Sequence, residues 1–141
     1  MNVYAKSSDA YLSQRILGAS PEQQAALIME AAQLHLGKAI QALNKQDLSG
    51  TALSLYRVTE ALTEATVRLN REDGGELVHR LDKLYEWWAK EILLACEERD
   101  TARMETVAMQ MGEIRQAWEQ FHEKTIGSRQ NEFTPLENQV V

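Results

Sequence analysis

The sequence is poor in the residues that would indicate several common classes of protein. Its 141 residues include one cysteine, Cys96, which excludes an intramolecular disulfide and a cysteine-rich zinc site. With only 2 prolines and 7 glycines, the chain suits long, uninterrupted helices better than a many-stranded β fold. The length fits one domain with a hydrophobic core rather than two.

The sequence also has no surplus of positive charge. The formal net charge is −6, and lysines and arginines are scattered singly among aspartates and glutamates. Binding to a phosphate backbone depends on concentrated positive charge. The sequence therefore argues against a nucleic-acid partner.

Long hydrophobic runs are absent as well. No apolar stretch approaches the ~20 residues that a membrane span needs, and the N-terminal residues MNVYAKSS lack the apolar run of a secretory signal. The lone cysteine is compatible with a reducing compartment. We therefore expect a cytoplasmic protein that does not insert into a membrane.

What the sequence does contain is helical periodicity. Four segments carry apolar residues at alternating steps of three and four, the spacing of one face of an α-helix. These segments span residues 20–43, 52–69, 77–95 and 104–121, and a polar break at 44–50 separates the first two.

The boundaries of these segments carry capping signals. Ser20 can cap a helix, Pro21 fits the first helical position, and Gln23 can complete a capping box. Two adjacent glycines in residues 70–75 indicate a loop, because glycine is costly inside a helix. Asp100 is available as the cap of the last helix.

Four amphipathic helices of similar length with short connections favour an all-α fold, an antiparallel four-helix bundle. We assign residues 20–124 to this bundle. Residues 1–19 form an N-terminal segment, expected to be a short docking helix that caps a groove. Residues 125–141 show little periodicity, so a disordered C-terminal tail is expected there.

Three of the helices carry more apolar residues than a bundle core requires. Flanking apolar residues often thicken the core, but an amphipathic guest helix also docks through anchors at this spacing. Val58 and Val78 belong to these extra lines. The candidate residues of a binding groove are Leu27, Leu34, Leu53, Tyr56, Tyr85, Trp87 and Leu94. The fourth helix has one main apolar exception outside its core face, Met109.

The pattern closest to an enzyme is a pair of Glu-x-x-His motifs, Glu76 with His79 and Glu119 with His122. Di-iron carboxylate bundles use two such motifs, with every ligand projecting inward. Here apolar neighbours such as Leu77 take the inward positions. We predict no catalytic residue, no metal site and no cofactor, and a di-metal carboxylate oxidase is the least favoured alternative.

Several stretches together resemble the FliS family of flagellin-specific export chaperones. The most specific is LNREDGGEL at 69–77, with its double glycine, followed by Leu84-Tyr85. The resemblance covers about residues 10–121. The other matching pieces are Ala10-Tyr11, ASPE at 19–22 and Ala117-Trp118.

The resemblance implies an antiparallel bundle that binds the disordered C-terminal segment of flagellin in the cytoplasm. It implies that binding prevents premature polymerisation and presents flagellin to the export gate of the flagellar type III apparatus, without a nucleotide. The alternative is a structural bundle that forms a homodimer. Candidates for a cap over the groove, or for contact with the export gate, are Tyr11, Leu12, Ile16 and Leu17.

Overall fold

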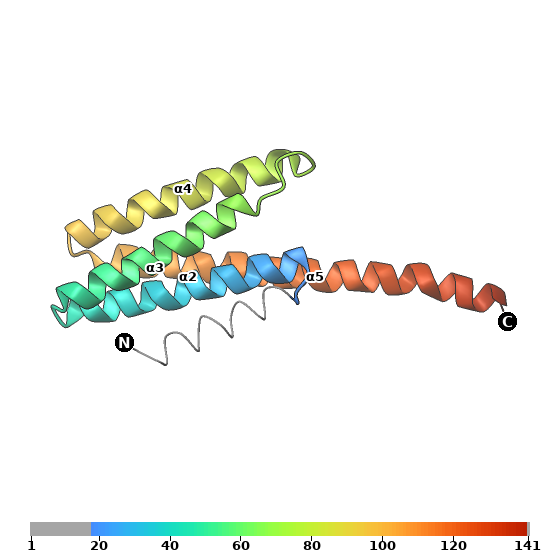
Figure 1. Ribbon diagram of the computed structural model, residues 1–141, viewed down its shortest axis with the longest axis horizontal. Helices are drawn as coiled ribbons and strands as arrows, with labels where there is room; N and C mark the ends of the chain where they lie inside the picture. The colour runs from blue at the N-terminus through green and yellow to red at the C-terminus, as the bar shows by residue number, and fades with distance from the viewer. Residues whose placement is uncertain (1–17, 141) are drawn as a thin grey trace.

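The computed structural model describes the backbone of residues 18–140 and the side chains of residues 18–124. Within this range it contains four helices: α2 (Pro21–Asn44), α3 (Leu48–Val67), α4 (Gly75–Glu97) and α5 (Thr101–Val140). Helices that follow one another in the chain run antiparallel, and α5 returns beside α2 (Figure 1). The predicted all-α four-helix bundle is confirmed.

The start of α2 is capped as predicted. The Ser20 hydroxyl accepts a hydrogen bond from the backbone N–H of Gln23 at 3.1 Å, and the Gln23 side chain accepts one from the N–H of Ser20 at 3.0 Å. This reciprocal pair satisfies two backbone donors that have no partner inside the helix. Asp100 also acts as expected, since its carboxylate accepts from the N–H of Arg103 at 3.2 Å.

Two tight turns of the same construction join α2 to α3 and α4 to α5. In each, a residue with positive φ ends the first helix, Gln46 at 60° and Arg99 at 57°. The aspartate that follows, Asp47 or Asp100, bonds its N–H back to the helix just completed, at 2.9 and 2.8 Å. Such a left-handed residue closes a helix compactly but is strained when it is not glycine.

The predicted break at 44–50 is shorter than expected. Asp47 caps α3 by accepting a hydrogen bond from the N–H of Gly50 at 2.9 Å. The helix therefore begins at Leu48, before the first residue of the apolar periodicity. The capping aspartate, rather than an apolar residue, sets this boundary.

The double glycine connects α3 to α4, and each glycine has its own reason. Gly75 has φ of +56°, a conformation that other L-residues adopt at a cost. Gly74 has no room for a side chain, because a Cβ atom there would overlap the Val78 side chain and the carbonyl oxygen of Asn70.

The hydrophobic core is built around α2, which packs along both α3 and α5. Between α2 and α5, the Gln33 amide donates to the carbonyl oxygen of Ala108 at 3.0 Å, and a Cβ at Gly112 would press on this amide at 2.7 Å. Helix α4 packs less extensively against α5 and least against α3. Trp88 on α4 donates to Gln110 on α5 at 2.8 Å.

Some positions face differently from the prediction. Val58 and Tyr85 were assigned to extra apolar lines, but both are buried in the core. Leu77 and Phe121, assigned to inward positions, are exposed. Because α3 and α4 are apolar on more than one side, the period of the pattern identifies the helix without fixing which side is buried.

The threonines of α3 explain part of this rotation. Thr59 and Thr66 belong to the predicted core face, yet each hydroxyl donates to a backbone carbonyl of its own helix, at 3.0 and 2.9 Å. Their hydroxyls need no partner in the core, so they lie at its edge, and Val58 and Ala65 turn inward instead.

The segment 125–140, predicted as a tail outside the bundle, has a helical backbone that extends beyond the other three helices (Figure 1). Its predicted disorder and the domain boundaries at residues 19 and 124 stay predictions. None of the described helices combines the length and the apolar character that crossing a membrane would require.

Candidate functional site

The contact between α3 and α4 leaves an open hollow of about 340 Å³, which we call the seam groove. Leu62 and Tyr85 supply its apolar floor, and threonines and carboxylates form its edges. The lining residues are Thr59, Leu62, Thr63, Thr66 and Val67 from α3, and Asp82, Tyr85, Glu86 and Ala89 from α4.

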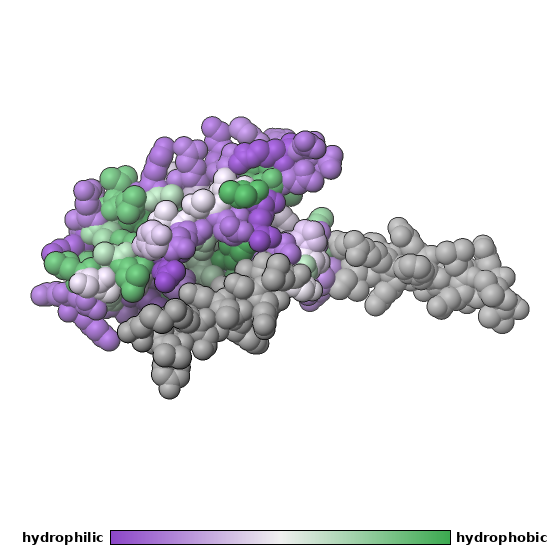
Figure 2. All heavy atoms as spheres, in the orientation of Figure 1, coloured by the Kyte–Doolittle hydropathy of each residue, from purple (hydrophilic) through white to green (hydrophobic). Residues whose placement is uncertain are grey.

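Exposed apolar residues extend the seam groove along both helices. Tyr56 precedes Thr59 and Thr63 at steps of three and four, so it lies on the same face of α3. Leu93 follows Ala89 by one turn on α4. Because α3 and α4 are antiparallel, both residues continue the groove in one direction. Tyr56 is 61% and Leu93 56% exposed, and Figure 2 shows hydrophobic residues gathered over this part of the molecule.

A second hollow, which we call the end cavity, lies where α2 and α3 meet the start of α4. It holds about 300 Å³. Apolar side chains dominate its lining, with Glu22 and Arg68 among the few charged members. The lining residues are Pro21, Glu22, Ala25, Ile28, Ala65, Arg68, Leu69, Asn70, Val78, Tyr85 and Trp118.

Tyr85 lies between these two hollows and contributes to both linings. It is 2% exposed, and its ring stacks on Trp88 with 5.5 Å between centroids. Burial raises the pKa of the Tyr85 phenol above its ordinary value, while a hydrogen bond with Trp118 acts in the opposite direction. A raised pKa keeps this phenol neutral in the core.

Ion pairs at the edge of the seam groove are exposed. Asp82 lies 3.4 Å from Arg71, and Glu86 lies 3.2 Å from Lys90. Exposed pairs of this kind contribute ~0–1 kcal/mol each. They give the groove a polar rim around an apolar floor, an arrangement typical of protein interfaces.

The other predicted groove residues lie on separate surfaces. Trp87 and Leu94 are exposed beside Glu91, which pairs with Arg103 of α5, so they lie on the α5 side of α4. Leu53 is exposed on α3, three residues before Tyr56. Their binding roles stay predictions.

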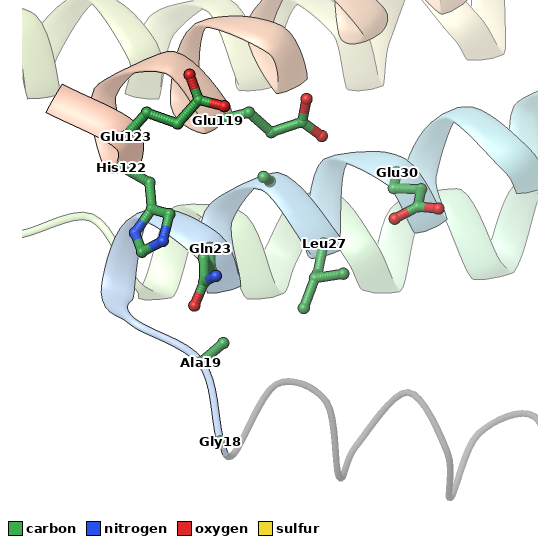
Figure 3. A pocket seen from close by; sticks show the side chains of 9 residues that line it. Gly18, Ala19, Gln23, Leu27, Glu30, Glu119, His122 and Glu123 are labelled. Carbon is green, nitrogen blue, oxygen red and sulfur yellow. The ribbon is translucent and has the colours of Figure 1, made fainter. Parts of the chain in front are cut away.

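On α2, Leu27 is half-buried and Leu34, two turns further, is exposed. Leu27 lines the α2–α5 cleft, an open hollow of about 500 Å³ at the start of α2. Figure 3 shows the carboxylates of Glu119 and Glu123 on α5 across from Gln23 and Leu27 on α2.

The Glu-x-x-His motifs have other partners. His122 Nδ1 lies 2.8 Å from the Ser20 hydroxyl, which ties α5 to the start of α2. Glu76 pairs with Arg80 at 2.8 Å. Among the described side chains, no group of three or more His, Cys, Asp or Glu residues is placed to hold a metal ion.

The sequence interpretation missed Leu93 and Val67, which lie along or in the seam groove. Their signal was available in part, since Leu93 continues the series Asp82, Glu86 and Ala89 at helical steps. That series becomes recognisable as a groove wall only once α3 is known to lie against it. Tyr11, Leu12, Ile16 and Leu17 lie outside the described residues.

Comparison with known proteins agrees with this geometry. The model of the family "Flagellar protein FliS" matches residues 4–125. The chain is similar to the flagellar secretion chaperone FliSB of Pseudomonas aeruginosa, with 23% identity over 105 residues, covering 74% of this chain and 83% of the relative. It is also similar to the flagellar secretion chaperones FliS of Vibrio cholerae (26% over 121 residues, 85% and 86% covered) and Salmonella typhimurium (26% over 110 residues, 77% and 82% covered).

Proposed function

The chain belongs to the FliS family of flagellar proteins, and from this membership we propose that it binds the C-terminal segment of flagellin in the cytoplasm. Binding keeps flagellin from polymerising early and presents it to the flagellar type III export apparatus. The similar proteins of Vibrio cholerae and Salmonella typhimurium carry the name flagellar secretion chaperone. This role of the family is not enzymatic.

The observation that supports the proposal most directly is the seam groove with its exposed extension. A disordered guest loses conformational entropy when it binds, which offsets much of the contact energy. Useful affinity therefore requires a long apolar surface. Tyr56 and Leu93 supply such a surface beside the floor formed by Leu62 and Tyr85, and an amphipathic helix docks in grooves of this kind.

The polar rim of the groove bears on how binding responds to salt. Asp82 and Glu86 already have partners of their own, Arg71 and Lys90. We therefore expect guest affinity to come mainly from apolar burial, and to change little between low and physiological ionic strength.

We also propose that residues 1–17 cover apolar surface until the guest arrives, through Tyr11, Leu12, Ile16 and Leu17, or that the same residues contact the export gate. The described chain begins at Gly18, which lines the α2–α5 cleft beside Leu27 (Figure 3). The segment therefore starts next to an apolar floor. Deleting residues 1–17 should raise affinity for flagellin, because a tethered competitor reduces apparent affinity.

The first test is calorimetric titration with a peptide covering the last helical segment of flagellin. We expect one-to-one binding with a clearly negative heat-capacity change, the signature of apolar burial. Tyr56→Asp and Leu93→Asp should each weaken binding by about 2 kcal/mol or more, roughly 30-fold.

Met109→Asp is the matched control, because Met109 is 60% exposed and lies on α5, outside the groove. It should leave both affinity and stability within about 0.5 kcal/mol. If the full chain and the chain lacking residues 1–17 both fail to bind the peptide, the proposed client is wrong. Equal losses in all three variants would show that the groove is not the binding surface.

A homodimer is the second candidate, and the exposed Trp87 and Leu94 on the α5 side of α4 favour it. Sedimentation with and without the flagellin peptide separates the two functions. A dimer that persists when peptide is bound would assign these residues to self-association. A dimer that dissociates would show that guest and second copy compete for one surface.

A further inference from the structure

The seam groove and the end cavity meet at one side chain. Of the described residues that line them, Tyr85 is the only one that both share. On α3 the two hollows follow one another without a gap, since Leu62 and Thr66 line the first and Ala65 and Leu69 line the second. The Tyr85 ring therefore divides what would otherwise be one continuous channel along α3.

This ring is held firmly in place. It stacks on Trp88 at 5.5 Å with 28° between the ring planes, and Trp88 is itself fully buried and bonded to Gln110 of α5. At its far end the phenol hydroxyl meets Trp118. A partition held at both ends does not swing aside to accommodate a larger guest side chain.

The sizes of the two hollows make the partition consequential. At about 340 and 300 Å³, each lies at the lower limit of the ~300–1,000 Å³ usual for ligand pockets. One branched or unbranched aliphatic side chain fills such a hollow, whereas an indole would have to extend past the Tyr85 ring. Overpacking a fixed wall is penalised as strongly as leaving a void.

Resting on the proposed function, we propose that Tyr85 determines the specificity of the seam groove: as a partition, it limits the apolar anchor of the guest to a side chain of about leucine or methionine size. The floor of the groove then selects among flagellin segments by the size of one buried residue. The exposed extension at Tyr56 and Leu93 adds affinity without this discrimination, because it has no opposing wall.

The test compares the full-length chain with its Tyr85→Leu and Tyr85→Phe variants. The probes are the peptide of the last helical segment of flagellin and a set in which each leucine in turn is replaced by tryptophan. Wild type and Tyr85→Phe should bind the leucine form at least about tenfold more tightly than the tryptophan form at one position. Tyr85→Leu should remove or reverse this preference. The control Tyr56→Leu alters a tyrosine without a partition role and should preserve the ratio.

If Tyr85→Leu weakens every peptide by the same factor, Tyr85 is only structural and the proposal is wrong. Circular dichroism and thermal melts establish that the variants are folded, and Tyr85→Met provides a larger replacement if the leucine variant does not fold.

A second measurement does not depend on flagellin. An opened apolar cavity binds benzene, so benzene should shift the indole N–H resonances of Trp88 and Trp118 in Tyr85→Leu, but not in Tyr85→Phe. The absence of benzene binding in the leucine and methionine variants would overturn the partition. Failure of wild type to bind any peptide, with benzene still bound by Tyr85→Leu, would instead contradict the proposed client.

Discussion

The two sides of α3 differ in how completely they are packed. Toward α2, small and large apolar residues interdigitate, with Ala32, Leu36 and Ala39 fully buried on the facing helix. Toward α4, threonines, exposed ion pairs and a hollow of about 340 Å³ take their place. One helix therefore contributes to the core with one side and to the seam groove with the other.

This difference separates stability from binding. A protein that must cover apolar segments of a guest needs unsaturated apolar surface, and such surface in the core would leave voids that reduce stability. Here the α2 interfaces supply close packing, whereas the α3–α4 seam remains open. Changes on the two sides should accordingly have different effects.

The largest expected effect is on the packed side. Leu36→Ala removes a fully buried side chain of α2 and should reduce the free energy of unfolding by about 2–5 kcal/mol. Leu93→Ala, at the seam, should cost less than about 0.5 kcal/mol, because most of its side chain is already exposed. Urea unfolding followed by circular dichroism measures both. Similar losses in the two variants would remove the distinction.

A smaller effect concerns pH and acts on the seam. Since burial raises the Tyr85 pKa above the unfolded value of 10.0, this group's contribution is constant below that pH. As pH rises above about 10, the unfolded chain loses the phenol proton first, so stability falls until the folded pKa is passed. Urea midpoints measured between about pH 8 and pH 11 should decline more steeply for wild type than for Tyr85→Phe. Parallel declines would contradict the burial of this phenol.

The smallest expected effect concerns the turns, which touch neither side of α3. Gln46 holds a positive φ of 60° without being glycine. Gln46→Gly relieves this strain and should stabilise the protein by about 0.5–1 kcal/mol, with flagellin affinity unchanged. A thermal melt and one titration check this. A lower melting temperature would show that the flexibility glycine adds to the unfolded chain outweighs the relief.

How much the sequence predicted follows the same division. The start of α2 is set by three local residues, Ser20, Pro21 and Gln23, whose capping chemistry does not depend on the rest of the chain. Its buried line was predicted for the same reason, because α2 has one dominant apolar face, with Met29 and Leu36 at its centre.

The seam could not be predicted in this way. Tyr56 is recognisable as surplus apolar surface, but its neighbour across the groove depends on how α4 is rotated about its axis. That rotation follows from tertiary contacts, such as the hydrogen bond from Trp88 to Gln110 and the ion pair of Glu91 with Arg103. Periodicity contains neither, so Tyr85 was assigned to the surface and Leu93 was not selected.

The pairing of α2 with α5 also determines when the molecule is complete. The hydrogen bond from Gln33 to Ala108 joins residues 75 positions apart, and the contact of Ser20 with His122 joins residues 102 apart. A ribosome adds ~5–20 residues per second, so α2 waits on the order of 5–20 s for α5 to be made. During that time α3 covers one side of α2, while the other side presents an apolar stripe to the cell. The nascent chain passes through a stage in which it resembles the kind of client that we propose it later protects.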